Sequence, residues 1–432
     1  MGLNKFLFEN EAVHGINSPS DYLYIKILRF TLRVIASWPQ KELGEKEPVA
    51  LNTFLKYFYL LATIGCQLGA SLYLRAYNNE LTFLEAGHTY LMIFMTFIDI
   101  SRIVTLTFSQ KYRKLSKEFF TDIHLFYFKD KSEYAMKTHK QVHLMSHLFT
   151  LWLLSQMLFG LSCFNLIPMY NNYVAGRYRS GGTQNSTFEH SLYYKYPFDT
   201  FTDIKGYLLA NVINWALSYL CATWFCMFDL LLSLMVFNIW GHFKMLIHML
   251  NNFPRPSLET SCLVEDGVTL THAKYTEEQL VEVSKKLKEC VDYHRLILEF
   301  THKVSKVFGP MLFAYYLFHQ TSGCLLLLEC SQMTAPAIMR YLPLTIITTQ
   351  QLIQLSVIFE LIGSESEKIL NAVYSVPWEC MDTKNRKFFA FFLMNVREPV
   401  HVKALGVANV GVTSMAAILK TSLSYFAFLR SI

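Results

Sequence analysis

Residues 207–237 read YLLANVINWALSYLCATWFCMFDLLLSLMVF, an apolar run in which Asp229 is the only charged side chain. A run of about 18 or more predominantly apolar residues is long enough to cross a bilayer as a helix. Because lipid offers no water to unpaired backbone groups, a helix is the structure that such a run favours. The segment therefore predicts a membrane-spanning helix.

Further runs of the same kind lie on either side of this segment. We predict seven spans in all, at residues 52–74, 84–108, 142–167, 207–237, 307–330, 337–362 and 406–429. The composition agrees, because 52% of the 432 residues are hydrophobic and only 17% are charged, which is unusual for a soluble protein. We expect an all-α membrane protein with seven transmembrane helices.

The basic residues predict how these spans are oriented. Of the 39 Lys and Arg residues, 29 lie on the side of the N-terminus and six on the opposite side. Because positive charges are retained in cytosolic loops, we expect a cytosolic N-terminus and an extracellular C-terminus. The acceptor triplet Asn185-Ser186-Thr187 lies in the predicted extracellular loop 168–206, so we predict glycosylation at Asn185.

This topology and the absence of catalytic motifs exclude several classes of function. A G-protein-coupled receptor has the reverse orientation, and an odd number of spans does not form the inverted repeats of many transporters. The sequence holds no hydrolase, zinc, phosphate-loop or dinucleotide motif, so we expect no enzyme, cofactor or metal. A net charge of +6 does not indicate a nucleic-acid partner. A metabotropic receptor stays open, and an N-terminus reachable from outside the cell would favour it.

Two segments outside the spans are predicted to be helical. Residues 22–35 are apolar, carry basic residues at helical spacing and lie between Pro19 and Pro39, which indicates a helix in the inner membrane interface. Thr276 and Gln279 have the spacing of a capping box. The amphipathic pattern after them predicts a cytosolic helix that continues into the fifth span.

The run FFAFFLMNV at 388–396 is strongly apolar but too short to cross a bilayer. Such a run requires burial, either against the amphipathic helix of the fourth loop or against a neighbouring subunit. We therefore predict an intracellular helical assembly domain. The alternative is a re-entrant or interfacial segment within one subunit.

The C-terminal third carries a recognisable set of residues. These are Ser364 to Leu370, Ala372-Val373-Tyr374, Trp378, Lys384, Arg386, Lys387, Pro399, Gly406 and Ser424-Tyr425-Phe426, with Tyr293-His294-Arg295 before the fifth span. In these residues, in its span number and in its inverted orientation, the chain resembles the insect odorant receptor family. The Ser424-Tyr425-Phe426 ending is typical of a ligand-tuned subunit rather than of the coreceptor. A gustatory-type receptor channel that acts without the coreceptor is the alternative.

The resemblance implies an odorant-gated, non-selective cation channel in the plasma membrane of an olfactory neuron dendrite. Four subunits would surround a central pore, with an odorant coreceptor as the partner in a heterotetramer. The implied division of the chain is a cytosolic N-terminus at 1–51, spans one to four at 52–237, a cytosolic loop at 238–306, spans five and six at 307–362, a cytosolic assembly segment at 363–405 and a pore-lining helix at 406–432.

The same resemblance implies roles for particular residues. For the pore and its gate they are Phe428, Ile432, Lys420 and Tyr425, and for assembly they are His294, Trp378, Phe388, Phe391 and Pro399. The implied ligand-binding residues are Tyr90, Phe94, Trp152, Gln156, Phe159, Tyr207, Asn211, Trp215, Tyr341, Thr345 and Thr348. This set is aromatic and holds no charged side chain, which favours a small, flat, weakly polar volatile and disfavours a permanently charged one. Asp99 and Arg102 are expected to form a structural pair.

Overall fold

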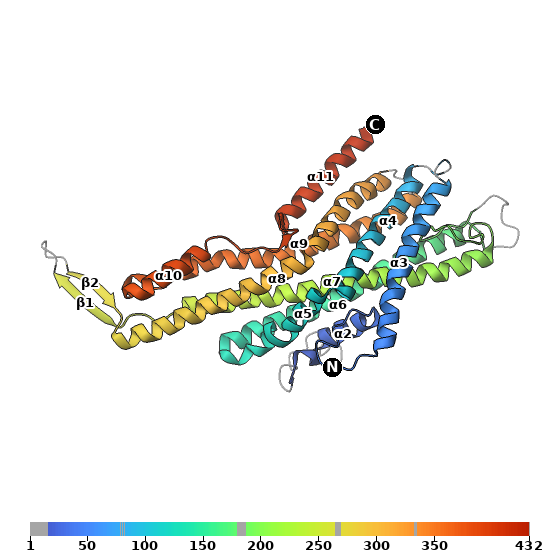
Figure 1. Cartoon of the computed structure of the whole chain (residues 1–432). Coiled ribbons are helices and arrows are strands. Elements are labelled where there is room, and N and C mark those ends of the chain that lie inside the picture. The colour runs from blue at the N-terminus through green and yellow to red at the C-terminus, as the bar shows by residue number, and fades with distance from the viewer. Residues whose placement is uncertain are drawn as a thin grey trace, which may run out of the picture.

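The computed structural model describes residues 16–431, apart from 78, 80, 82, 179–186, 264–268 and 332–334. The described chain is mostly helical (Figure 1). Its α-helices are α2 (Leu23–Val34), α3 (Val49–Tyr77), α4 (Phe83–Ile103), α5 (Gln110–Glu118), α6 (Glu133–Val174), α7 (Ile204–Asn251), α8 (Glu277–Cys330), α9 (Ala335–Tyr374), α10 (Thr383–Asn395) and α11 (Val412–Ser431). Short 3-10 or π turns are η1 (Pro19–Asp21), η2 (Val104–Phe108), η3 (Phe119–Ile123), η4 (Leu125–Tyr127), η5 (Lys129–Lys131) and η6 (Trp378–Cys380).

The predicted spans correspond to the long helices. Among the described residues, six helical segments are long and apolar enough to cross a membrane, within α3, α4 with η2, α6, α7, α8 and α9. They coincide with the first six predicted spans, and α11 is the seventh. This last helix begins later than predicted, because 408–409 form a strand and Gly406 takes a positive φ of 74° in the turn before it.

Several helices extend well beyond the length that a bilayer requires. Helix α8 has 54 residues, about 81 Å at the usual rise per residue, whereas about 20 residues cross the hydrocarbon core. The predicted capping box is confirmed at its start: the Gln279 N–H donates to Thr276 Oγ1 (3.2 Å) and the Thr276 N–H donates to Gln279 Oε1 (3.1 Å). The amphipathic segment and the fifth span are therefore one continuous helix.

The run FFAFFLMNV lies in α10, which packs beside the N-terminal part of α8 (Figure 1). Phe389 and Phe392 are buried, and the Phe392 ring meets His294 of α8 with centroids 5.5 Å apart. Phe391 and Met394, on the other side of α10, are 64% and 68% exposed. One apolar face of this helix is thus covered within the chain and one is not.

Helix α2 confirms the helix predicted at 22–35. Its apolar face, with Ile25, Leu28 and Leu32 fully buried, packs on α7 and α6. At the edge of this face, Arg29 and Arg33 both contact the carboxylate of Glu45, at 2.8 and 2.5 Å. In this chain the apolar face of α2 is covered by protein.

Two small hairpins depart from the all-α expectation. Strands β1 (Leu258–Leu263) and β2 (Thr269–Lys274) pair antiparallel, as do β3 (Lys403–Ala404) and β4 (Ala408–Asn409). The second hairpin rests on α8 at Gly309, whose carbonyl accepts a hydrogen bond from the Leu405 N–H (3.2 Å). A Cβ at position 309 would lie 2.8 Å from the Lys403 carbonyl oxygen, so the glycine permits this close approach.

Candidate ligand-binding site

A cavity of about 210 Å³ lies among the helices at the end of the bundle away from α10. Its walls come from α3, α4, α6, α7, α8 and α9, with two residues from the segment that precedes α7. Most of the lining is apolar, for example Met92, Met157 and Phe318, and the polar members include Asp99, Gln156 and Ser322. A concave apolar site with few polar groups is the usual form of a small-molecule site.

Helical periodicity explains which residues reach the cavity. On α4 the lining positions are 88, 91, 92, 95, 96 and 99, which repeat every three or four residues and share one face. On α6 positions 156, 157, 160, 161 and 164 follow the same rule. The side chains between them point away from the cavity.

The segment 187–203 folds back into the bundle and closes part of the cavity. Leu192 and Tyr194 line the cavity. The Leu192 carbonyl accepts from Asn214 Nδ2 (3.1 Å), and Ser191 Oγ donates to Asn165 Oδ1 (3.0 Å). Burial raises the pKa of Tyr194 well above its ordinary value, so its hydroxyl is neutral. Leu192 and Tyr194 were not predicted from the sequence, although the aromatic density of HSLYYKYPF at 190–198 was a usable signal.

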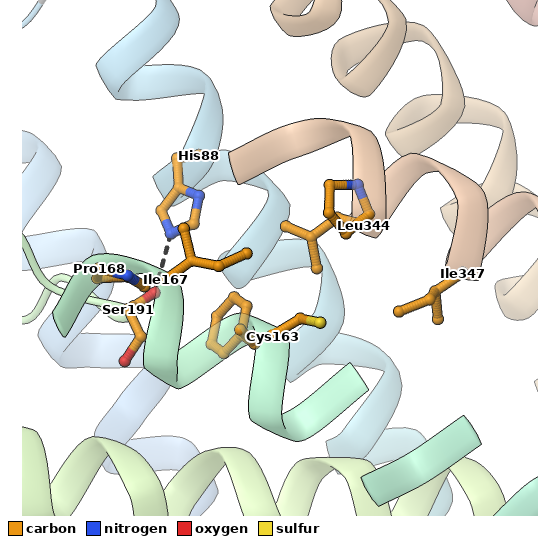
Figure 2. Close-up of a pocket in the computed structure, with 9 residues that line it drawn as sticks. His88, Cys163, Ile167, Pro168, Ser191, Leu344 and Ile347 are labelled. Carbon is orange, nitrogen blue, oxygen red and sulfur yellow. Dashed lines mark hydrogen bonds between the residues drawn. The ribbon is translucent and has the colours of Figure 1, made fainter. Parts of the chain in front are cut away.

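A smaller pocket adjoins the cavity where this segment meets α4, α6 and α9. Figure 2 shows His88 of α4 directed at Ser191, whose carbonyl lies 3.1 Å from the His88 Nε2. Leu344 and Ile347 of α9 form another wall of this pocket and also line the larger cavity. His88 therefore joins the segment before α7 to the helices of the site.

The predicted ligand-binding residues lie in the cavity wall, on outer helix faces and in contacts elsewhere in the bundle. Gln156 and Thr348 line the larger cavity. Four others lie on outer helix faces, with exposed fractions from 38% to 62%: Tyr90, Phe94, Trp152 and Phe159. The Trp152 indole N–H donates to Gln354 Oε1 of α9 (2.9 Å). Gln156 of α6 and Thr348 of α9 therefore meet at one cavity, while the predicted aromatic residues of α4 face away from it.

The remaining members of the set have other partners. Tyr207 is buried in an aromatic cluster, 4.4 Å from the Phe188 ring centroid. Asn211 Nδ2 lies 3.6 Å from Met169 Sδ, and Trp215 is partly buried. Tyr341 packs 6.0 Å from the His88 ring, and its carbonyl accepts from the Thr345 hydroxyl (2.8 Å). None of these five residues is among those that line the larger cavity.

The expected pair of Asp99 and Arg102 is wrong. The Arg102 guanidinium instead contacts Asp229 of α7, with Nη2 3.4 Å from Oδ1, and lies 3.9 Å above the centroid of the Phe225 ring. Asp99 lines the cavity, although it was not among the predicted ligand-binding residues. Although Asp99 and Arg102 are three residues apart on α4, Arg102 contacts Asp229 and Asp99 lies beside Cys221.

The predicted pore residues lie on α11, which leaves the bundle beyond its first turns (Figure 1). Lys420, Tyr425 and Phe428 are exposed, the last two by 57% and 60%, while the Ser422 hydroxyl donates to the Gln320 carbonyl of α8 (3.2 Å). Of the predicted assembly residues, Trp378 stacks on Phe389, Phe388 is 38% exposed and Pro399 is exposed. Ile432 and Asn185 lie outside the described residues.

Comparisons with known proteins identify relatives of this chain. The family described as 7tm Odorant receptor matches residues 82–423. Odorant receptor 13a of Drosophila melanogaster is 25% identical over 162 residues, which cover 34% of this chain and 39% of that protein. Odorant receptor 85c of the same organism is 24% identical over 165 residues, covering 37% and 42%. The match thus spans less than half the length of these relatives.

Solved structures share the fold. The insect olfactory receptor OR5 from Machilis hrabei superimposes with a TM-score of 0.73 at 15% identity, covering 94% of this chain and 97% of that chain. The same receptor in complex with eugenol gives a TM-score of 0.73 at 14% identity, covering 99% of each. Since the family match extends over most of the chain, this multi-pass helical membrane protein belongs to the odorant receptor family.

Proposed function

We propose that this chain is a subunit of an odorant-gated, non-selective cation channel. The observation that carries the proposal is the 210 Å³ cavity lined by six helices, in a chain of the odorant receptor family. The receptor of the same fold was solved with eugenol, a small aromatic volatile. A cavity of about 150 Å³ holds a benzene-sized molecule, so the cavity here suits one ring with a short substituent.

The surfaces left uncovered in the single chain support assembly into a tetramer with an odorant coreceptor. Phe391 and Met394 form an exposed apolar face on α10, which packs beside α8. Exposed apolar surface of this kind is stabilised by contact with a second subunit. With the N-terminus inside, this face lies in the cytosol below the plasma membrane of the sensory dendrite.

The pore is formed by α11 from each subunit. Lys420 and Phe428 are eight residues apart, on one face of this helix, and both are exposed in the single chain. A ring of apolar side chains at Phe428 closes a pore by dewetting, while a charge within a span faces water or protein rather than lipid. Ligand opens the channel because it binds the open arrangement more tightly than the closed one.

The test is whole-cell current in cells that express this chain with and without the coreceptor. Volatiles are applied while G-protein signalling is blocked. We expect odorant-evoked cation current only in the co-expressing cells. Current without the coreceptor would favour a gustatory-type channel. A second-messenger response before the block, with no current from surface-expressed protein, would contradict the channel proposal.

A further inference from the structure

Asp99 is a buried carboxyl group at the wall of an otherwise apolar cavity. Its side chain is 4% exposed, it lines the cavity, and its Oδ1 has no hydrogen-bond partner among the described residues. The Cys221 thiol lies within hydrogen-bonding reach of the same carboxyl group, but a thiol is a weak donor. A buried polar atom without a partner is costly in free energy, so a ligand that supplies a donor is favoured here.

The neighbouring charges do not satisfy Asp99. The closest cation along its helix, Arg102, is held by Asp229 and rests on the Phe225 ring. Phe225 lines the cavity and Arg102 does not. The Arg102 guanidinium thus acts on Asp99 only through its charge, because its ion-pair contact is with Asp229. A cationic group in the cavity beside Asp99 would complete the charge balance of this layer.

Two other polar atoms on the cavity wall can accept a hydrogen bond as well. Gln156 donates through Nε2 to Gln350, which leaves its Oε1 without a partner, and Ser322 Oγ also has none among the described residues. Both residues line the cavity. Both unpaired atoms can accept a hydrogen bond, and most of the surrounding wall is apolar.

We infer that the ligand of this cavity is a small volatile amine with an apolar body, and that Asp99 is the specificity-determining residue that pairs with its ammonium group. This inference rests on the proposed function, because it names the ligand class of the same site. An ammonium group supplies three donors, and its charge matches the carboxylate. The aromatic lining, with Phe225 and Tyr194, accommodates the apolar body.

The test compares three ligands that differ only at the head group: 2-phenylethylamine, 2-phenylethanol and propylbenzene. Binding to the purified complex with the coreceptor is followed by ligand-induced thermal stabilisation, and current is recorded in parallel. We expect the amine to bind about tenfold or more tightly than the alcohol, with the hydrocarbon weakest. Asp99→Asn should remove the advantage of the amine and leave propylbenzene unchanged. Asp122→Asn, which removes an exposed carboxylate, should preserve the order.

The outcomes separate this inference from the proposed function. Equal binding of amine and hydrocarbon to the wild-type complex overturns the inference even if neutral volatiles evoke current. Tight amine binding without current from any ligand keeps the inference and overturns the channel proposal. If Asp99→Asn does not reach the surface, Asp99→Glu serves instead, and loss of amine selectivity in this charge-retaining variant would contradict a role for the carboxylate.

Discussion

The contribution of the buried ion pair between Arg102 and Asp229 to stability can be tested by substitution. Both side chains are at most 2% exposed. Removing one partner leaves a buried charge, which costs about 3–5 kcal/mol. We therefore expect Asp229→Leu to lower the melting temperature strongly. The double variant Arg102→Leu/Asp229→Leu should recover much of the lost melting temperature, measured on purified protein in detergent.

Lys303→Ala at the partly exposed contact with Glu118 is the control, expected to cost about 1 kcal/mol or less. Equal losses at both sites would contradict this account.

His124 makes stability depend on pH at the end of the bundle near α2. Its Nδ1 accepts from the Phe126 N–H (3.2 Å) and its Nε2 lies 3.1 Å from the Tyr24 hydroxyl, so the neutral ring uses both nitrogens. Burial, reinforced by nearby histidines, lowers its pKa well below 6.5. The stabilisation is therefore complete above pH 6.5 and is lost as the pH falls below it.

We predict that acidification from pH 7.5 to 5.5 destabilises the wild type through this group by about 1.4 kcal/mol. The His124→Gln variant should lose that part of the pH dependence in thermal unfolding. The His302→Gln variant alters an exposed histidine and should behave like the wild type. If the stability of His124→Gln changed with pH as much as that of the wild type, this imidazole would not contribute to the pH dependence.

Individual residues of the site show where sequence reasoning succeeds and where it does not. Gln156 and Thr348 line the cavity, whereas Tyr90 and Phe94 face away from it. Depth along a span could be estimated from the sequence, but an apolar helix surrounded by both lipid and protein shows little amphipathic contrast. The face that meets the cavity, and with it Asp99, therefore required the three-dimensional packing.

Among the elements, the β3–β4 hairpin depends on Gly309 of α8. A Cβ there would approach a backbone oxygen at 2.8 Å, whereas one at Gly65 of α3 would meet nothing within 4 Å. We expect Gly309→Ala to displace the hairpin and lower stability by about 1–3 kcal/mol, measured by thermal unfolding. Gly65→Ala should be neutral or stabilising. Equal stability of the two variants would contradict the observed contact.

Helix α10 provides a second test at this scale. Introducing charge into its uncovered face with Phe391→Asp and Met394→Asp should reduce the tetramer fraction in cross-linking or size-exclusion measurements, because an apolar contact between subunits would be replaced by carboxylates. Lys384→Asp on the exposed start of the same helix controls for the added negative charge. A tetramer fraction unchanged in the double variant would contradict assembly through this face.

The elements themselves were largely predictable. Long apolar runs specify spans because helices satisfy backbone hydrogen bonds in lipid, and the capping box at Thr276 and Gln279 marked the start of α8. The hairpins and the inward fold of 187–203 were not predicted. They depend on contacts between distant residues, such as Leu405 with Gly309 and Leu192 with Asn214, that leave no local periodicity in the sequence.

In the protein as a whole, the proposed function requires that a ligand bound in the cavity among the six helices opens the channel. Thr348 lines this cavity, while Ile346, two residues earlier on α9, is 59% exposed on the outer face. A tryptophan at 348 would fill space that the ligand needs, whereas one at 346 would face lipid. The two positions therefore form a matched pair on a single helix.

The most direct measurement is odorant-evoked current in cells that co-express the coreceptor with the wild type, Thr348→Trp or Ile346→Trp at equal surface density. We predict that Thr348→Trp loses sensitivity to the activating ligand by about tenfold or more, while Ile346→Trp responds like the wild type. If Thr348→Trp kept wild-type sensitivity although the indole fills the cavity, the ligand could not bind there.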